Sequence, residues 1–568
     1  MACIGIDLGT TNSLVTCWRD GKVELIPNDF GEYMTPSVVG FTKDNQVLTG
    51  KAAREMLISE PDRTFREFKR TMGTGRRYYA GRHEYSSEEL SSMILRQLKA
   101  DAERYLGEAV TEAIISVPAY FSDSQRSATR MAGKLAGLKV DRIINEPSAA
   151  ALLYHIGTKE SHANYLIFDF GGGTLDVSLV EAFDNIVEIE AVSGDNQLGG
   201  KNFNEVIAAY FYDKNDLSEK DLNTEDRELV YREAEICKIM LSEQDEAERR
   251  LEVQGKSYVM HITKKEFKRI AEPIFHKMIL PIQKVLSMSG FSASEIDHVV
   301  LVGGSSKMPL VQELMESLFV GKLCKDQNPD EIVALGIGML TGIKAREDTI
   351  KDYLLSDICP FSLGTAIADG SFSVIIERNE ILPCSKSGYY TTVGDMQTNI
   401  DFEVYQGEDI IAAKNELLTT ITIEVPPKPR GEVQLKVEFS YDINGIFDIN
   451  IICKDDGNVI HKTIVNENVA MSEEELQARI ENLEQLRIKG RDETKIDYLL
   501  YRANRIYKES GTEARQILEQ AIADYRYTQR CENDPQKKRE NHIRFMMLLE
   551  AAEREQQKLD ISSFLDKE

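Results

Sequence analysis

The sequence predicts a multidomain chain in which an α/β domain with two duplicated lobes is followed by a β-rich domain and a helical region. The first supporting observation is a motif that occurs twice, as IGIDLGTTNSLV over residues 4–15 and LIFDFGGGTLDVSLV over residues 166–180. The second is that alternating strand and helix patterns change to short period-two strands from residue 359 onward. At 568 residues, the chain is also long enough to require several domains.

Each copy of the repeated motif is an apolar strand that ends in aspartate, followed by a glycine-rich turn and a second strand. Asp7 and Asp169 hold the same place in the two copies. A glycine-rich turn brings backbone N–H groups close to a ligand, usually phosphate, and a neighbouring carboxylate can hold a hydrated divalent ion. Two such hairpins, facing each other, would clamp a nucleoside triphosphate. The alternative of two unrelated turns does not explain the matching aspartates.

A third glycine-containing segment, VVLVGGSSKMP, follows an apolar strand at residues 299–309. It is neither a Walker loop nor a Rossmann G-x-G-x-x-G motif. The three segments together resemble the actin-like ATPase superfamily, which also contains sugar kinases and the seventy-kilodalton heat-shock chaperones. This resemblance implies an actin-like α/β ATPase domain.

Three further segments resemble the DnaK-type seventy-kilodalton heat-shock chaperones in particular. They are IISVPAYFSDSQRSATRMAGKLAGL at 114–138, RIINEPSAAALLY at 142–154 and NPDEIVALG at 328–336. The resemblance extends to about residue 470 and is weaker beyond it, and the short C-terminal region is closest to the HscC-like branch. It implies an ATP-dependent chaperone, active in protein folding and the stress response, in which ATP hydrolysis controls the binding and release of extended apolar client segments. A small-molecule kinase or a filament-forming ATPase of the same superfamily is the competing interpretation.

Composition limits the classes of partner. The formal net charge is −26 and no lysine- or arginine-rich run is present, so nucleic acid is not expected as a partner. The eight cysteines show no C-x-x-C spacing, which argues against a zinc site or disulfide framework and suits a reducing compartment. Neither a signal-peptide pattern nor a membrane-spanning run is evident, so we expect a cytoplasmic protein with no membrane partner.

Four regions are expected along the chain. They are an ATPase domain at 1–347, an interdomain linker at 348–358, a β-sandwich substrate-binding domain at 359–470 and a helical lid at 471–568. In the linker, Tyr353, Leu354 and Leu355 are expected to dock in one nucleotide state. The alternative is the end of a helix that enters a strand.

The two C-terminal regions have local signals of their own. Residues 433–441 alternate apolar and polar side chains, and Asn444-Gly445 then predicts a two-residue hairpin turn, as in the peptide-binding sandwich that this region resembles. Ser472 begins a capping-box signature, S-x-x-E, so a helix is expected to start there. The helical pattern that follows is interrupted at Gly490, Gly511 and Pro535. It is interpreted as a short lid, and a solvated helical bundle with no closing role is the alternative.

The family resemblance assigns roles at the ATPase site. Asp7 and Asp169 would hold Mg²⁺, mostly through water, because Mg²⁺ gives up water reluctantly. Lys69 would supply positive charge near the attacking water, and Glu146 and Asp176 would organise metal, water and potassium. Without the resemblance, Lys69 would be read as a solvated lysine.

The nucleotide contacts follow from the same motifs. The phosphate-binding residues are expected to be Gly9, Thr10, Thr11, Asn12, Gly171, Gly172, Gly173 and Thr174, with Thr174 at the γ-phosphate. Gly199 and Gly200 are also expected to bind the nucleotide. Those around adenosine are expected to be Glu235, Lys238, Ser242, Gly303, Gly304, Ser305, Lys307 and Asp330. Lys307 departs from the family, which usually has an arginine that stacks on adenine. Lysine cannot stack in the same way, so nucleotide affinity and exchange are expected to differ.

The resemblance also implies a peptide channel and a coupling route. The channel residues are Thr365, Tyr390, Ile400 and Phe402, with Ala368 and Val393 at a covering arch. Several of them depart from the family pattern, so fast, selective peptide binding is expected, and ordinary sandwich core is the alternative for each. The coupling residues are Pro118, Arg126, Arg142, Asn145, Leu354, Leu355 and Asp357. A J-domain co-chaperone is the expected partner at this surface, and the need for a nucleotide exchange factor is left open.

Overall fold

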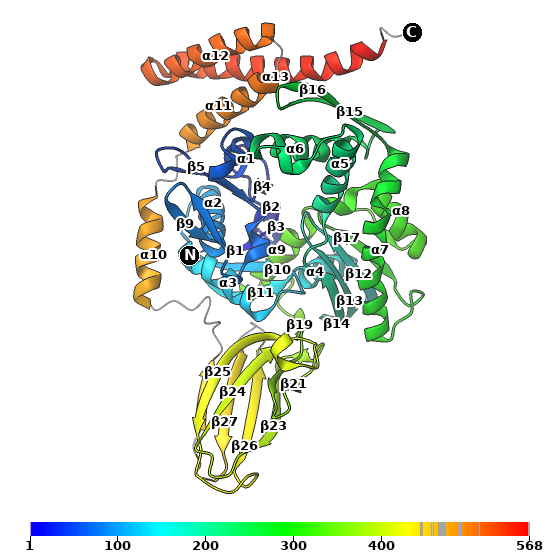
Figure 1. Ribbon diagram of the computed structural model, residues 1–568, viewed down its shortest axis with the longest axis vertical. Helices are drawn as coiled ribbons and strands as arrows, with labels where there is room; N and C mark the ends of the chain where they lie inside the picture. Colours follow the sequence, from blue (N-terminus) through cyan, green and yellow to red (C-terminus); the bar gives the residue numbers. More distant parts are fainter. Residues whose placement is uncertain are drawn as a thin grey trace.

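The N-terminal part of the protein contains two large mixed sheets, which we call lobe I and lobe II together with their helices (Figure 1). The computed structural model describes residues 2–158, 160–442, 447–455, 457, 459–463, 473–486, 491–509 and 512–565. In spatial order, the lobe I sheet has β11 (Lys139–Asn145), β10 (Val110–Val117), β1 (Ala2–Asp7), β2 (Asn12–Arg19) and β3 (Lys22–Leu25). The lobe II sheet has β18 (Leu323–Cys324), β17 (His298–Val302), β12 (His162–Phe170), β13 (Leu175–Phe183) and β14 (Ile186–Asp195).

The two sheets repeat one topology. β1 pairs antiparallel with β2 and parallel with β10, and β12 pairs antiparallel with β13 and parallel with β17. Asp7 is the last residue of β1, and Asp169 is the second to last of β12. The strand pairing therefore agrees with two duplicated lobes that carry equivalent aspartates.

Two helices lie between the sheets and join the lobes. α4 (Glu146–Thr158) and α9 (Ile332–Lys344) share a buried core with Ile114 of lobe I and Ile167 of lobe II. They approach closely at Gly336, where a Cβ atom would lie only 1.9 Å from the carbonyl oxygen of Ala149. The outer helices are α2 (Ser87–Leu106) and α3 (Asp123–Leu135) on lobe I, and α5 (Gly200–Lys214), α7 (Lys264–Ser289) and α8 (Pro309–Leu318) on lobe II.

Smaller elements extend each lobe beyond its sheet. On lobe I these are β4 (Thr35–Pro36), β5 (Val38–Phe41), β6 (Val47–Thr49), α1 (Gly50–Ser59), β7 (Thr64–Arg66), β8 (Arg77–Ala80) and β9 (His83–Ser86). On lobe II they are α6 (Thr224–Met240) and the hairpin β15 (Glu246–Val253) and β16 (Lys256–Thr263). Short 3₁₀ turns include η2 (Phe68–Thr71) and η4 (Gly304–Lys307).

The expected linker forms a strand rather than a helix end. β19 (Leu354–Ile358) lies parallel to β14 and extends the lobe II sheet, and β22 (Ile381–Leu382) pairs with its far end. Tyr353 and Leu355 pack against the core between the lobes, whereas Leu354 is 63% exposed. The Leu354 backbone pairs with Ile186 of β14, whereas its side chain points to solvent, because alternate side chains of a strand point to opposite faces.

Two four-stranded antiparallel sheets follow and face each other across one core. The first has β21 (Phe372–Ile376), β20 (Leu363–Ala366), β24 (Asn399–Gln406) and β25 (Glu416–Glu424). The second has β23 (Cys384–Thr391), β26 (Gln434–Tyr441), β27 (Phe447–Cys453) and β28 (Val459–Thr463). Val433, Leu435, Val437, Phe439 and Tyr441 are all buried, which confirms the period-two prediction. Asn444 and Gly445 lie outside the described residues.

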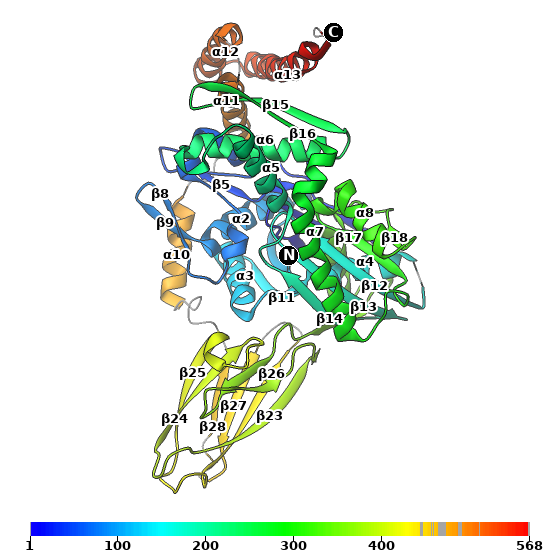
Figure 2. The same cartoon turned by 45° about the vertical axis from the view of Figure 1, so that its right-hand side comes forward.

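The chain ends in four helices, α10 (Glu473–Gln485), α11 (Arg491–Glu509), α12 (Thr512–Cys531) and α13 (Pro535–Leu565). Ser472, Gly490 and Gly511 lie outside the described residues, and Pro535 is the first residue of α13, a position that suits proline. Figures 1 and 2 show α10 beside lobe I and α11 to α13 at the end of the molecule opposite the sandwich.

Helix α10 is packed on lobe I by both apolar and charged contacts. Leu483 is 3% exposed within the lobe I core, and its carbonyl oxygen accepts a hydrogen bond of 2.7 Å from Arg96. Arg479 forms an ion pair of 2.6 Å with Glu89, the residue that also caps α2. The helical region therefore lies on the ATPase lobes in this arrangement, away from the sandwich.

All eight cysteines are free thiols in this structure. Among the helices built from described residues, none combines the length and apolar character needed to cross a lipid bilayer.

Candidate nucleotide site

The two glycine-rich turns meet between the lobes. A Cβ atom on Gly172 would lie 2.0 Å from the Thr11 hydroxyl oxygen, and one on Gly173 would lie 3.1 Å from the Thr10 methyl carbon. Only glycine permits this approach, since real Cβ atoms do not come so close to other atoms. The turns of β1–β2 and β12–β13 therefore face each other, as the repeated motif suggested.

Each turn is held by its own neighbours. Ser37 supports the lobe I turn, because its hydroxyl donates to the Gly9 carbonyl at 2.7 Å and its N–H donates to the Thr11 carbonyl at 2.8 Å. The lobe II turn accepts from the start of α5, where Gly200 N–H donates to the Gly171 carbonyl at 2.9 Å. Sequence reasoning missed Ser37, since no motif distinguishes it.

Four carboxyl groups gather around one buried lysine behind these turns. Lys69, 4% exposed, forms an ion pair of 2.8 Å with Glu146 at the start of α4. Asp7 accepts a hydrogen bond of 2.9 Å from Ser116, and Asp176 accepts one of 3.1 Å from the Tyr120 N–H. The structure thus brings together these residues from η2, α4, β1 and β13, with Asp169 from β12 nearby.

The electrostatics of this cluster favour cations. Burial and the neighbouring Glu146 raise the pKa of Asp7 to about 7 and that of Asp176 to about 7, against usual values near 4. The pKa of Asp169 is raised by the same two causes. In the described part of the chain, Oδ2 of Asp176 finds no hydrogen-bond partner. A single ammonium group does not compensate four carboxylates, so the residues fit bound metal ions.

Mg²⁺ would need further ligands besides these side chains. Within the described ranges, no three His, Cys, Asp or Glu side chains converge as direct metal ligands. Asp7 and Asp169 could therefore hold Mg²⁺ only with water or phosphate oxygens completing its six-fold shell.

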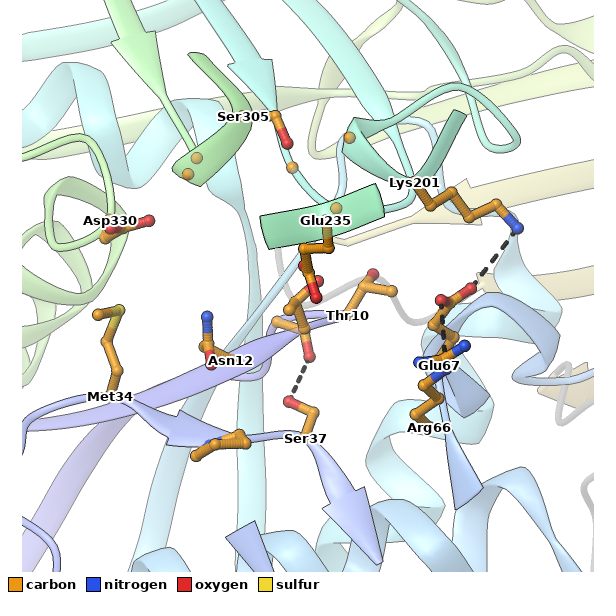
Figure 3. Close-up of a pocket in the computed structure, with 18 of the residues that line it drawn as sticks. Thr10, Asn12, Met34, Ser37, Arg66, Glu67, Lys201, Glu235, Ser305 and Asp330 are labelled. Atoms are coloured by element: carbon orange, nitrogen blue, oxygen red, sulfur yellow. Dashed lines mark hydrogen bonds and ion pairs between the residues drawn. The ribbon is translucent and has the colours of Figure 1, made fainter. Parts of the chain in front are cut away.

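The turns and the carboxyl cluster line one cleft of about 840 Å³. Of the nucleotide-binding and catalytic residues expected from the sequence, Gly173, Asp176 and Gly199 alone do not line it, and they stand directly behind its wall. Residues that sequence reasoning missed also line the cleft, among them Met34, Ser37, Arg66, Glu67, Lys201 and Arg505. Figure 3 shows Lys201 aimed at Glu67, a pair separated by 3.5 Å that joins lobe II to lobe I.

The expected adenosine residues occupy the lobe II side of this cleft. Burial lowers the pKa of Lys238, and its ammonium group donates to the Gly200 carbonyl at 3.3 Å. The ammonium group of Lys307 forms an ion pair with the Asp330 carboxylate. Gly303 has φ of +81°, and a Cβ atom there would lie 2.6 Å from the Phe170 carbonyl oxygen, so this turn also requires glycine.

A buried polar chain connects the site to β19. Arg126 donates to the Asn145 side-chain oxygen at 2.5 Å, and Asn145 in turn donates to Asp357. Asn145 directly precedes Glu146, and the positive charge of Arg142 interacts with the Asp357 carboxylate. Four of the expected coupling residues, Arg126, Arg142, Asn145 and Asp357, therefore lie together.

Pro118 lies in the loop that follows β10, where its carbonyl oxygen accepts a hydrogen bond of 3.1 Å from the Phe121 N–H.

A second connection was not expected from the sequence. The ring of Tyr120, whose N–H binds Asp176, lies 4.6 Å from the Phe361 ring and 5.4 Å from the Arg378 guanidinium of the sandwich region. Nearby, the Tyr441 hydroxyl donates to buried Asp123, which Gln406 also contacts. These residues give no local sequence signal, because the contacts join segments hundreds of positions apart.

The six expected peptide-channel residues fall into three classes of exposure. Thr365 and Phe402 are 1% and 4% exposed, Tyr390 and Ile400 are half-buried, and Ala368 and Val393 are exposed. The Tyr390 ring stands edge-on to Phe402 with centroids 5.6 Å apart, and its hydroxyl is 3.1 Å from that of Ser373. In this arrangement Thr365 and Phe402 belong to the sandwich core, so a peptide would reach Phe402 only after Tyr390 moved.

Comparison with known families matches the Hsp70 protein family over residues 3–80 and 75–562. This match covers nearly the whole chain, so the chain belongs to the Hsp70 family. Members of the family are ATP-dependent chaperones that bind ATP and ADP with Mg²⁺, and they generally bind unfolded polypeptides and J-domain co-chaperones.

The raised carboxyl pKa values predict how stability depends on pH. A carboxyl group with a raised pKa in the folded state binds its proton more tightly there, so stability falls as the pH rises through about 7. The metal-free, nucleotide-free protein should lose about 2 kcal/mol more stability than Asp176→Asn between pH 5.5 and 8. Urea unfolding at both pH values measures this difference, and parallel losses in the two proteins would contradict the assignment.

Proposed function

We propose that this protein is a chaperone in which the ATP state of the cleft controls the binding and release of extended apolar client segments in the β-sandwich region. The observation that supports this most is the position of β19, which belongs to the lobe II sheet and leads directly into the sandwich. We place the ATPase domain at 1–347, the linker at 348–358, the sandwich at 359–470 and the helical lid at 471–568.

Hydrolysis requires that charge be neutralised while water attacks the γ-phosphoryl group. Lys69 is positioned for this, because Glu146 holds its ammonium group in the buried cluster behind the two turns. Glu146 and Asp176 would orient the attacking water, and the backbone N–H groups of the turns would hold the β- and γ-phosphates, with Thr174 at the γ-phosphate. Mg²⁺, held by Asp7 and Asp169 through water, would supply charge neutralisation on the phosphates. Potassium as a second cation stays a prediction from the sequence.

Coupling would use the two connections already described. Asn145 lies next to Glu146 and bonds Asp357 of β19, so a shift of the carboxyl cluster would move the linker strand. Tyr120 joins Asp176 to the sandwich through Phe361 and Arg378. We propose that a J-domain co-chaperone stimulates hydrolysis at this surface.

The client site would be the channel bounded by Tyr390 and Ile400 and covered by Ala368 and Val393. Because Tyr390 is hydrogen-bonded to Ser373 and packs on Phe402, we propose that movement of the Tyr390 ring opens the channel to clients. Assignment to the HscC-like branch, the stress role and a cytoplasmic location stay predictions from the sequence.

Peptide anisotropy with and without ATP tests this function. A labelled extended apolar peptide should bind the full chain with ADP and dissociate at least tenfold faster after mixing with Mg²⁺-ATP. A small-molecule kinase or a filament-forming ATPase would bind no such peptide. A peptide that binds equally and leaves at one rate in both nucleotide states would refute the proposal.

Lys69→Ala should slow hydrolysis while leaving ATP bound. The phosphate turns remain intact, but a transition-state charge contact is lost, which costs on the order of 3 kcal/mol, or roughly a hundredfold in rate. Single-turnover hydrolysis and equilibrium binding of fluorescent ATP measure the two effects separately. The exposed Lys22 on β3 provides the control, since Lys22→Ala should hydrolyse ATP at the normal rate.

Leu355→Asp should uncouple the sandwich from the ATPase site, whereas Leu354→Asp should not. Leu355 packs on the core between the lobes and an unpaired carboxylate cannot be buried there, but Leu354 is 63% exposed. In Leu355→Asp, basal hydrolysis should persist while ATP-driven peptide release falls at least tenfold. Equal effects of the two substitutions would show that strand docking does not carry the signal.

A further inference from the structure

Helices α11 to α13 lie near the nucleotide cleft, which Arg505 of α11 helps to line. Figures 1 and 2 show α11 running from α1 of lobe I, with α12 and α13 extending over α6 and the β15–β16 hairpin of lobe II. The cleft is lined by residues of both lobes, so separation of the lobes would open it to a bound nucleotide. A segment that binds both lobes would therefore control that separation.

On lobe I, α11 is attached by an apolar contact. Tyr498 and Tyr501 pack against the buried cluster of Ala53 and Met56 on α1. The Tyr498 ring also stands edge-on to Phe30, with 5.1 Å between the ring centroids. Neither tyrosine lines the cleft, so this contact is separate from the nucleotide itself.

A charged contact stands beside the apolar one. Arg505 of α11 donates from Nε to Glu55 of α1 at 2.8 Å and from a terminal nitrogen to Glu553 of α13 at 2.6 Å. Its side chain is 12% exposed and that of Glu55 is 17% exposed, so the pair is largely shielded from solvent. Arg505 thus fixes α11, α13 and α1 to one another, and it also lines the cleft.

The bundle reaches lobe II through the β15–β16 hairpin. Arg515 of α12 lies 3.6 Å from Glu252 of β15, and α13 packs alongside the same strand. Beneath the bundle, Arg54 of α1 approaches Glu235 of α6 to 3.8 Å, which brings the two lobes close at this end of the cleft. The C-terminal helices therefore contact both sides of the opening.

We infer that α11 to α13 form a latch that retains bound nucleotide by holding lobe I to lobe II, with Arg505–Glu55 as its principal polar contact. The inference rests on the nucleotide binding proposed above. Because the same helices form the expected lid, their departure from the lobes would release nucleotide. A single movement of α11 to α13 would thus change both the position of the lid and the rate of nucleotide exchange.

Stopped-flow release of a fluorescent ADP analogue from the full-length protein tests the latch. Tyr501→Ala and Arg505→Lys should each speed release about fivefold to tenfold, because each weakens a largely buried contact between α11 and α1. Glu252→Arg should speed release by a smaller factor, about twofold, since its contact with Arg515 is exposed. The control is Arg544→Ala, which removes an exposed arginine that joins α13 to Asp524 of α12 and should release ADP at the normal rate.

The variants separate the latch from its alternatives. Faster release in Arg505→Lys alone would mean that Arg505 contacts the nucleotide directly, which would overturn the latch, as would unchanged release in all three variants. Thermal unfolding, monitored by circular dichroism, identifies any variant that fails to fold. The ADP release rates of the folded variants then test the latch. If the unmodified protein does not bind the ADP analogue, the proposed function fails instead.

Discussion

The structure depends on one electrostatic constraint, the burial of four carboxyl groups around a single lysine between two lobes. Asp7, Asp169, Asp176 and Glu146 cannot all ionise there unless cations accompany them, and Lys69 supplies only one positive charge. The glycine turns place backbone donors in front of this cluster, where phosphate and its metal would bind. The lobes therefore have an electrostatic reason to close on a metal–nucleotide complex and to loosen once it has left.

The same cluster explains why the sandwich lies where it does. Glu146 follows Asn145, which bonds Asp357 of the linker strand, and Asp176 binds the N–H of Tyr120, whose ring packs on Phe361. Each connection passes through a single residue, Asn145 toward the linker strand and Tyr120 toward the sandwich. On the opposite side, Arg505 brings the C-terminal helices to the cleft. The linker strand and the helical region are thus both connected to residues of one cleft.

The sequence predicted the parts of this arrangement that local motifs encode. The duplicated turns with Asp7 and Asp169 could be predicted because glycine and aspartate recur at fixed spacing. The alternation of apolar and polar residues from Val433 to Tyr441 predicted a buried strand face. Side-chain burial in β19 and the contacts between distant segments could not be predicted from the sequence. Leu354 and Leu355 look alike in sequence, and only the direction of β19 decides which is buried. Tyr120 and Arg505 depend on contacts between distant segments, which no local pattern encodes.

The most direct test of the account is the rate at which ATP drives peptide release in Tyr120→Ala. This substitution keeps the backbone N–H that binds Asp176 and removes the ring that packs on Phe361. Single-turnover hydrolysis in this variant should stay within about twofold of the unmodified protein. The factor by which ATP accelerates peptide release should be at least tenfold smaller than in the unmodified protein. Normal ATP-driven release in this variant would contradict the claim that the carboxyl cluster communicates with the sandwich through this contact.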